Sequence, residues 1–328
     1  MNKLRAALIG LGMMGKNHAR ILSSLDGVDL VAVADPQGDV MGALPNHQIF
    51  RTVEEVITKG VDYCIVATPT AFHEEVSIKL IEAGIHLLIE KPVAHTHDSA
   101  LRILAAARKE NIVCAVGHIE RYNSALQQAR KRIMNNELGD IYQISTRRQG
   151  PFPSRISDVG VVMDLATHDV DLTSWMSDAM YVAVNAQAAT RSHRKSEDLV
   201  AVVGQLDNGV VVNHLVNWLS PLKERKIVIT GERGTFVVDT LHSDLTLYTN
   251  GTIDISQQSI AHFKGVTQGD IHIYAFSKPE PLRVEHESFR DAILGKPNEL
   301  VSIESGATTV KIAELIIESY KNQKTILA

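Results

Sequence analysis

Residues 4–15 read LRAALIGLGMMG, and this stretch decides the fold. The apolar run Leu4–Ile9 predicts a buried strand, and a helical pattern follows over Met13–Ser24. Three glycines with the spacing G-x-G-x-x-G lie at the junction, where they allow a tight turn, close approach of a pyrophosphate and close packing of helix on strand. We therefore expect a dinucleotide to bind at this turn. The glycines are Gly10, Gly12 and Gly15.

A carboxylate follows the next strand and bears on which dinucleotide binds. Asp35 ends the predicted strand Val28–Ala34, 20 residues past Gly15. It would accept hydrogen bonds from the adenine-ribose hydroxyls and repel a 2′-phosphate, and no arginine follows within residues 36–39. We expect NAD as the cofactor, with its phosphates at the N–H groups of Met13 and Met14. A purely structural glycine turn beside a solvated aspartate is the alternative.

Alternating strand and helix patterns continue through the first 120 residues. The expected strands are nearly continuous apolar runs, which is typical of a parallel sheet covered by helices on both faces. We expect a doubly wound Rossmann domain over residues 1–120. Its predicted strands are Leu4–Ile9, Val28–Ala34, Gln48–Phe50, Val61–Ala67, Ile85–Ile89 and Ile112–Val116, and its predicted helices are Met13–Ser24, Thr52–Lys59, Phe72–Ala83 and His97–Lys109.

The pattern changes in the second part of the chain. Residues 181–249 read mostly as strands with turn signals between them, such as Asp207-Asn208-Gly209 between two valine-rich runs. Grouped strands and grouped helices predict an α+β domain with a large, mostly antiparallel open sheet over residues 121–328. The last helix can pack back on the first domain. The predicted helices are Asn123–Asn135, Val159–Met176, Leu282–Leu294 and Ile303–Lys321, and Ile141–Arg148 is a predicted strand.

Composition excludes several classes of protein. The chain has 328 residues, of which 45% are hydrophobic and 22% charged, with a formal net charge of −5. These values suit a soluble two-domain protein and give no footprint for nucleic acid. No apolar run reaches the ~18 residues of a membrane-spanning helix, and no signal-peptide pattern opens the chain. Cys64 and Cys114 lie in apolar runs, so we expect inert thiols and a cytoplasmic location.

Lys91 follows the predicted strand Ile85–Ile89 in the sequence Glu90-Lys91-Pro92. The carboxyl ends of strands face the ligand crevice of a doubly wound sheet, so this lysine is placed where cofactor and substrate meet. An ammonium group there can stabilise the alkoxide that forms as hydride leaves an alcohol. The alternative for Lys91 alone is a surface lysine at a strand end. Together with the glycine turn, the position favours catalysis.

Thr68 and Pro69 end the predicted strand Val61–Ala67, and His73 follows shortly after. This segment faces the same crevice, so we expect contacts to the pyrophosphate or the nicotinamide ribose. For His73, the first turn of the following helix is the simpler interpretation.

Asp164 and His168 are four residues apart and share one face of a predicted helix. An aspartate can fix the tautomer of a histidine and tune it as a general base near neutral pH. Such pairs are also common as structural contacts. A metal site would need further ligands, and none lies nearby in the sequence, so we expect no metal.

These motifs, in this order, resemble the glucose–fructose oxidoreductase/inositol dehydrogenase/MocA family over essentially the whole chain. The resemblance implies a Rossmann domain followed by an open-sheet domain for substrate binding and oligomerisation. It also implies NAD(P)-dependent oxidation or reduction of sugars and cyclitols. Lys91 then corresponds to the family's active-site lysine, and Asp164 and His168 to its Asp/His pair.

A narrower resemblance is to the UDP-N-acetylglucosamine 3-dehydrogenase branch of this family. It rests on residues 117–123, 148–155, 158–164 and 217–223. Guanidinium groups around the Gly/Pro loop suit a diphosphate, although solvated strand-end charges are an equal alternative. Residues 122–124 read Tyr-Asn-Ser where relatives often have Phe-Asn-Pro. The expected substrate contacts are Arg121, Asn123, Arg148, Arg155 and Lys223.

The resemblance implies that His168 takes a proton from a sugar hydroxyl, that Lys91 stabilises the same oxygen, and that Asp164 holds the polar network in place. The 3-hydroxyl of UDP-N-acetylglucosamine is the expected target. Two alternatives remain: a dehydrogenase of a free sugar or cyclitol, which needs no diphosphate site, and a non-catalytic NAD-binding sensor. The uncovered sheet face predicts a homo-oligomer, a dimer or tetramer.

Overall fold

The computed structural model describes residues 3–153, 159–192, 195–251 and 267–328. By its internal contacts the chain divides into two compact units. The sequence suggested one boundary, at residue 120; the contacts instead group residues 279–314 with the N-terminal part. In the described part of the chain, no helix is long and apolar enough to cross a membrane. The first unit is Met1–Tyr122 with Pro279–Glu314, and the second is Asn123–Lys278 with Leu315–Ala328.

A parallel sheet of six strands forms the centre of the first unit, in the order β3-β2-β1-β4-β5-β6. The order changes direction between β1 and β4, which is the point where doubly wound sheets bind ligands. The predicted Rossmann sheet is confirmed. The strands are β1 (Leu4–Ile9), β2 (Val28–Ala34), β3 (Ile49–Phe50), β4 (Tyr63–Val66), β5 (His86–Glu90) and β6 (Cys114–Gly117).

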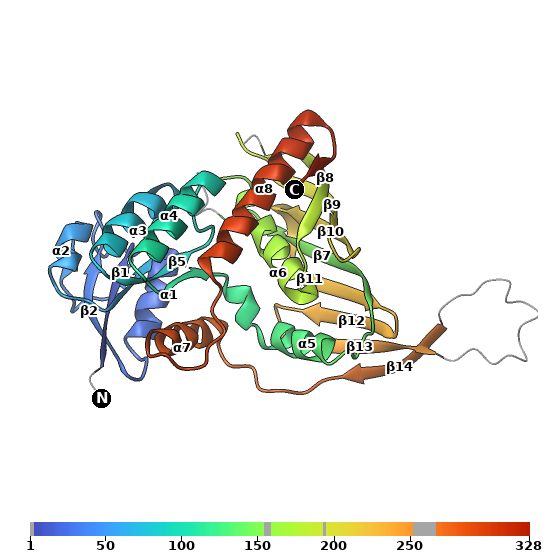
Figure 1. The fold of residues 1–328 in the computed structure, drawn as a ribbon, viewed down its shortest axis with the longest axis horizontal. Helices are drawn as coiled ribbons and strands as arrows, with labels where there is room; N and C mark the ends of the chain where they lie inside the picture. Colours follow the sequence, from blue (N-terminus) through green and yellow to red (C-terminus); the bar gives the residue numbers. More distant parts are fainter. Residues whose placement is uncertain (1–2, 154–158, 193–194, 252–266) are drawn as a thin grey trace, which may run out of the picture. The chain divides into compact units, whose positions relative to one another are not determined.

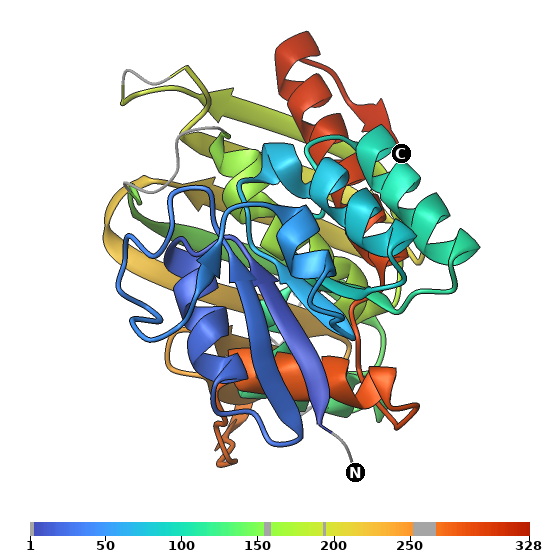
Figure 2. The ribbon, with the colours of Figure 1, turned by 90° about the vertical axis from the view of Figure 1, so that its left-hand side faces the viewer.

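Helices pack on this sheet in pairs, α1 beside α7 and α3 beside α4 (Figures 1 and 2). Local signals start several of them: Thr52 and Glu55 form a capping box, and Thr96 accepts from the Ser99 N–H. These helices are α1 (Met13–Leu22), α2 (Val53–Ile57), α3 (His73–Glu82), α4 (His97–Lys109) and α7 (Pro281–Ile293).

Helix α7 joins the first unit because its apolar face completes that unit's core. Phe289 is fully buried and meets the Tyr63 ring of β4 edge to face, with ring centroids 5.5 Å apart. Burial of a phenylalanine side chain contributes about 1.5–3 kcal/mol. The sequence pattern identified this helix but assigned it to the second domain, because the pattern does not specify which sheet a helix covers.

The second unit is built on a nine-stranded sheet in the order β14-β13-β12-β11-β7-β10-β9-β8-β15. Neighbouring strands are antiparallel except β7 and β10, so the predicted large, mostly antiparallel sheet is confirmed. The predicted hairpin at residues 207–209 joins β9 to β10. The strands are β7 (Ile141–Pro151), β8 (Tyr181–Ala189), β9 (Leu199–Leu206), β10 (Val211–Asn217), β11 (Leu219–Gly231), β12 (Gly234–Asp239), β13 (Asp244–Gly251), β14 (Thr267–Ile273) and β15 (Ile326–Leu327).

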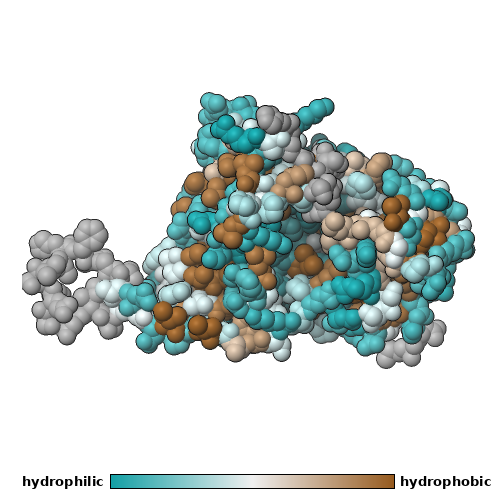
Figure 3. All heavy atoms as spheres, turned by 180° about the vertical axis from the view of Figure 1, so that it is seen from behind, coloured by the Kyte–Doolittle hydropathy of each residue, from teal (hydrophilic) through white to brown (hydrophobic). Residues whose placement is uncertain are grey.

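Helices cover one face of this sheet. Helix α5 (Ser124–Met134) packs on β12 and β13, and α6 (Thr167–Ser177) packs on β7, while α8 (Ile303–Asn322) ends in this unit. The strands alternate accordingly, as in β9, where Val200 and Val202 are buried. On the face of the molecule shown in Figure 3, exposed apolar residues are mixed with polar ones. The exposed apolar residues of these strands include Val182, Val203, Val211, Tyr248, Ile271 and Ile273.

Candidate active site

The turn between β1 and α1 excludes side chains at two of its glycines. Gly10 has a φ of +93°, and a Cβ there would lie 2.6 Å from the carbonyl oxygen of Ala67. A Cβ on Gly15 would lie 2.1 Å from the carbonyl oxygen of Gly10, so the helix passes very close to the turn. A Cβ on Gly12, in contrast, would meet nothing within 4 Å. The turn therefore leaves open space at the start of α1.

Within the described ranges, no side chain caps the N-terminus of α1. Gly12 is the N-cap residue, and Met13 and Met14 begin the helix, so their N–H groups suit an anion. Asp35 lies beside this turn: its Oδ2 accepts from the N–H of Leu11 and its Oδ1 from the N–H of Gln37, both at 2.8 Å. The carboxylate thus ties the glycine turn to the end of β2. Each oxygen keeps acceptor capacity for a ribose hydroxyl.

The segment after β4 approaches the glycine turn closely. The hydroxyl of Thr68, next to Pro69, is buried and has no hydrogen-bond partner within the described residues. The His73 ring is buried between two main-chain carbonyls, with Nε2 2.9 Å from the Thr68 oxygen and Nδ1 3.0 Å from the Pro92 oxygen. Burial lowers the pKa of His73. His73 therefore connects the segments after β4 and β5, and its ring nitrogens face protein.

These features fit a dinucleotide. An uncapped helix start with open space at Gly12 suits a pyrophosphate, and the orphaned hydroxyl of Thr68 is a buried polar group that a ligand can satisfy. NAD would be held by the glycine turn, Asp35 and the Thr68 segment, and when bound it supplies a hydride acceptor.

Lys91 follows directly after β5, where the sequence predicted it, and is half-buried. Glu90 is buried, and its Oε2 accepts from the N–H of Lys91 at 3.1 Å. The other oxygen, Oε1, lies 2.8 Å from Nε2 of His18 on α1. The backbone of Lys91 is thus fixed by a carboxylate that a buried histidine holds. No sequence motif indicates His18, because an isolated histidine on a helix is usually an ordinary core residue.

Asp164 and His168 lie in the second unit, both buried. The helix that carries them begins with a π-helical turn over Val162–Ala166 and continues as α6. The sequence predicted one α-helix over 159–176; π-turns inside helices often mark functional sites. Glu197 fixes the start of the π-helical turn, because its Oε1 accepts from the N–H of Val162 at 3.2 Å.

Arg148, an expected diphosphate contact, is only 3% exposed. Its Nε donates to Oδ1 of Asp169 at 3.0 Å, and Asp169 is also buried. The pair connects β7 to α6 beside His168. The structure therefore gives Arg148 an internal carboxylate partner, which no local sequence pattern identifies because the two residues are 21 positions apart.

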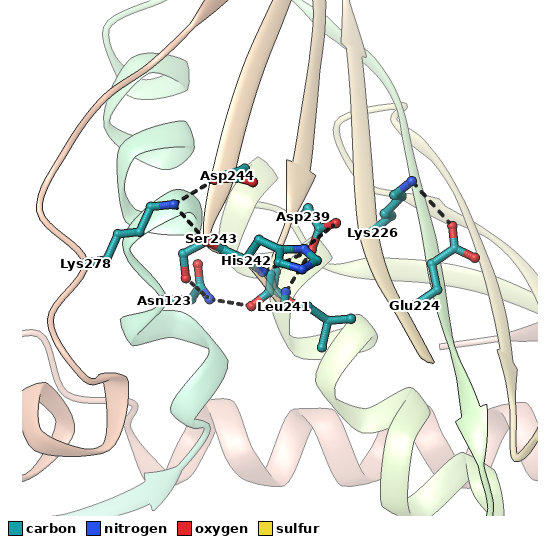
Figure 4. A network of polar contacts seen from close by, with 10 residues as sticks. Asn123, Glu224, Lys226, Asp239, Leu241, His242, Ser243, Asp244 and Lys278 are labelled. Carbon is teal, nitrogen blue, oxygen red and sulfur yellow. Dashed lines mark hydrogen bonds and ion pairs between the residues drawn. The ribbon is translucent and has the colours of Figure 1, made fainter. Parts of the chain in front are cut away.

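The other expected substrate contacts are dispersed. Asn123 caps α5 by accepting from the N–H of Ala125, and its amide donates to the Thr240 carbonyl and the Ser243 hydroxyl (Figure 4). Arg121, in the first unit, donates to the Ser305 hydroxyl. The remaining two are Lys223, which is exposed on β11, and Arg155, which lies outside the described residues.

The two cysteines offer no reactive thiolate. Burial raises the pKa of both thiols, that of Cys114 to about 12 with a further contribution from the charge of Glu304. Cys64 and Cys114 thus stay protonated near neutral pH, as the sequence predicted. No group of three or more histidine, cysteine, aspartate or glutamate side chains is arranged for a metal ion in the described ranges.

Comparison with curated proteins finds dehydrogenases. The chain is 29% identical to UDP-N-acetylglucosamine 3-dehydrogenase of Acidithiobacillus ferrooxidans over 296 residues, which cover 89% of this chain and 90% of that protein. It is 27% identical to inositol 2-dehydrogenase of Corynebacterium glutamicum over 225 residues, 65% of this chain and 67% of that protein.

Solved structures show the same fold. The structure of the Acidithiobacillus enzyme matches with a TM-score of 0.85 and 26% identity, over 98% of this chain and 99% of that one. The WlbA dehydrogenase from Bordetella pertussis, solved with NADH and UDP-GlcNAcA, matches in fold with a TM-score of 0.84 and 21% identity, over 100% of this chain and 98% of that one. Family models match residues 4–118, as the oxidoreductase family with an NAD-binding Rossmann fold, and residues 126–237, as the GFO/IDH/MocA C-terminal domain. The chain therefore belongs to the GFO/IDH/MocA family of oxidoreductases.

Proposed function

We propose that the protein oxidises the 3-hydroxyl of UDP-N-acetylglucosamine to a ketone, with NAD as hydride acceptor. The observation that carries the proposal is the presence of three parts in one chain: an uncapped glycine turn on α1, Lys91 at the end of β5, and the buried pair Asp164 and His168. The similarity to the Acidithiobacillus enzyme over 89% of this chain supports the choice of substrate.

In the proposed reaction, His168 and Lys91 have different roles. As hydride leaves the ring carbon, the hydroxyl loses its proton, and an imidazole is suited to accept it near neutral pH. His168 has this role in our proposal, and Asp164 maintains the polar network around it. Lys91 donates a hydrogen bond to the same oxygen and stabilises the negative charge that develops there. NAD, when bound, takes up the hydride.

A dehydrogenase of a free sugar or cyclitol is the second candidate. The similarity to inositol 2-dehydrogenase favours it. So does the position of Arg148, whose internal partner Asp169 leaves one fewer arginine for a diphosphate. In the proposed UDP-sugar reaction, exposed cations such as Lys223 take a larger share of the contacts to the diphosphate.

A panel of substrates separates the two candidates. Purified protein with NAD is assayed for NADH absorbance with UDP-N-acetylglucosamine, free N-acetylglucosamine, UDP-glucose and myo-inositol. We expect UDP-N-acetylglucosamine to exceed the free sugar in kcat/KM by at least about 100-fold, the lower limit for two hydrogen bonds to a charged diphosphate. Faster turnover of inositol or the free sugar would establish the second candidate.

We also propose that the protein forms a homo-oligomer through the exposed face of the nine-stranded sheet. Val203 on β9 is 56% exposed and Ile273 on β14 is 79% exposed, and large apolar patches on a sheet face mark interaction surfaces. Light scattering should give the mass of a dimer or tetramer, and Val203→Lys should lower it. A monomer at micromolar concentration would contradict the proposal.

A further inference from the structure

Four titratable side chains are buried together in the first unit, and only one of them belongs to the expected site. His18 on α1 is 0% exposed, and Glu90 at the end of β5 is 7% exposed. Glu285 and His286 on α7 are each 1% exposed. Such groups are costly to bury, and a cluster of them next to a proposed catalytic lysine requires a reason.

Hydrogen bonds connect three of these groups in a line that ends at Lys91. Nε2 of His286 lies 2.8 Å from Nδ1 of His18, and the two rings meet edge to face. Nε2 of His18 lies 2.8 Å from Oε1 of Glu90, and Oε2 of Glu90 accepts from the N–H of Lys91. The line therefore runs from α7 through α1 to the backbone that carries the proposed catalytic ammonium.

The charges along this line determine where its protons lie. Burial raises the pKa of Glu90, but the hydrogen bond and charge of His18, with the charge of Lys91, outweigh it, so the net pKa lies below the ordinary value. Burial lowers the pKa of His286 well below its usual range, and the charges of His18 and Arg283 add to this. An ionised Glu90 accepts from the Nε2–H of His18, and a single proton lies between Nδ1 of His18 and Nε2 of the neutral His286.

Glu285 keeps the cluster at a single negative charge. Neither of its carboxyl oxygens has a hydrogen-bond partner within the described residues. Burial, and then the nearby charge of Glu90, raise the pKa of Glu285 well above the ordinary value. Two adjacent buried carboxyls do not both ionise, so Glu285 stays neutral and Glu90 carries the charge. Among the described residues, the other titratable or charged groups that interact with the cluster are Lys91, His73, Tyr122 and Arg283.

We propose that His18, held by His286, is a positioning residue for Lys91: it fixes the Glu90 carboxylate, which in turn fixes the backbone of Lys91. The hydrogen bonds that define this role are independent of the proposed function, whereas its effect on catalysis rests on that function. Pro92 follows Lys91, and its carbonyl oxygen lies 3.0 Å from Nδ1 of His73. Buried imidazoles therefore contact the residues before and after Lys91. The arrangement keeps a flexible side chain anchored on a rigid backbone with a carboxylate beneath it.

Replacement of His18 tests the catalytic consequence. His18→Phe removes both ring nitrogens, and His18→Gln retains a donor that can reach Glu90. We expect His18→Phe to lower kcat about 10- to 100-fold, as for a displaced catalytic group, and His18→Gln to recover part of it. NAD affinity should stay within about twofold, since the glycine turn is untouched. His86→Phe is the matched control, because His86 lies at the other end of β5 and, among the described residues, accepts only from the Val113 N–H.

The pH at which activity falls on the acid side of the pH profile distinguishes a positioning role from a packing role. A loss of packing alone would leave this pH unchanged. His18 lowers the pKa of Glu90, so its loss should move the pH at which Glu90 takes up a proton upward. Activity of His18→Phe should therefore fall off at a higher pH than in the wild type. An unchanged acid limb with an unchanged kcat in folded His18→Phe would overturn the proposal.

Two measurements on the protein without substrate separate this proposal from the proposed function. Nitrogen-15 NMR of histidine-labelled wild-type protein should show His286 as a neutral imidazole whose Nε2 is hydrogen-bonded to His18, assigned with His286→Gln. In lysine-labelled protein, the Lys91 amide proton should shift upfield in His18→Phe, as its bond to Glu90 weakens, and stay unchanged in His86→Phe. A protonated His286, or an unmoved Lys91 amide, would contradict the positioning role even if the enzyme oxidises UDP-sugars.

Discussion

The first and second units encode their parts of the proposed site in different ways. In the first unit the site is formed mostly by backbone. It comprises glycines that exclude a Cβ, an uncapped helix start, and Lys91, whose backbone N–H donates to the Glu90 carboxylate. In the second unit it consists of side chains buried in pairs, such as Arg148 with Asp169 on α6. Glycine spacing specifies a backbone conformation and can be read locally. The partner of a buried charge lies elsewhere in the chain, so the local sequence does not identify it.

The comparison has a practical consequence for charged residues near a motif. Arg148 and Asn123 both stand in segments that resemble a sugar-nucleotide dehydrogenase, and the structure gives both of them internal hydrogen bonds. A charged or polar residue in the right segment is therefore a weaker guide to substrate contacts than a glycine is to the cofactor turn.

The largest effect should come from breaking the buried pair in the second unit. Arg148→Met leaves Asp169 buried without its cation, so the free energy of unfolding should fall by about 3–5 kcal/mol in urea denaturation. Adding Asp169→Leu should recover part of the loss. Lys223→Met, at an exposed position, should change stability by less than about 0.5 kcal/mol. Unchanged stability with a raised KM for UDP-N-acetylglucosamine would make Arg148 a substrate contact after all.

Lys91→Ala tests the side chain on which the first unit depends. Loss of one hydrogen-bond donor to the developing alkoxide should lower kcat about 10²- to 10³-fold. The affinity for NAD, measured by calorimetry, should hold, because the glycine turn is intact. Lys109→Ala, on the exposed end of α4, serves as the control. Turnover that survives in Lys91→Ala would remove Lys91 from the mechanism.

Two glycines of one turn should respond in opposite ways. Gly12→Ala adds a Cβ into open space, so the melting temperature should hold, while NAD affinity should fall about tenfold as the methyl group occupies the pyrophosphate position. Gly15→Ala would place its Cβ 2.1 Å from the Gly10 carbonyl oxygen, so it should destabilise the fold itself. If Gly12→Ala bound NAD as tightly as the wild type, the turn would not hold the phosphates.

The sequence predicted much of the fold and part of the site, for identifiable reasons. The apolar strands and the turn Gly10–Gly15 predicted the Rossmann sheet, since each signal is local. The π-turn at Val162–Ala166 and the assignment of α7 to the first unit escaped prediction, because both depend on packing between distant segments. His18 and His286 escaped for the same reason: 268 residues separate them, and no motif joins them.

The smallest effect concerns Glu285, the neutral acid that interacts with Glu90. The pKa of Glu285 lies well above its ordinary value of 4.5 in the folded protein. Below that ordinary value both states are protonated; as the pH rises above it, only the unfolded chain ionises, and wild-type stability is lost. Glu285→Gln cannot ionise, so its free energy of unfolding relative to wild type should increase with pH. A difference that stays constant with pH would show that Glu285 is ionised in the fold.

Transfer of a labelled hydride tests the central claim most directly. UDP-N-acetylglucosamine carrying deuterium at C3 of the sugar is incubated with the protein and NAD, and the reduced cofactor is analysed by mass spectrometry and proton NMR. The proposed reaction predicts deuterium at C4 of the nicotinamide ring and a 3-keto sugar, and neither product with Lys91→Ala. Unlabelled NADH, or no reduced cofactor at all, would contradict oxidation at C3.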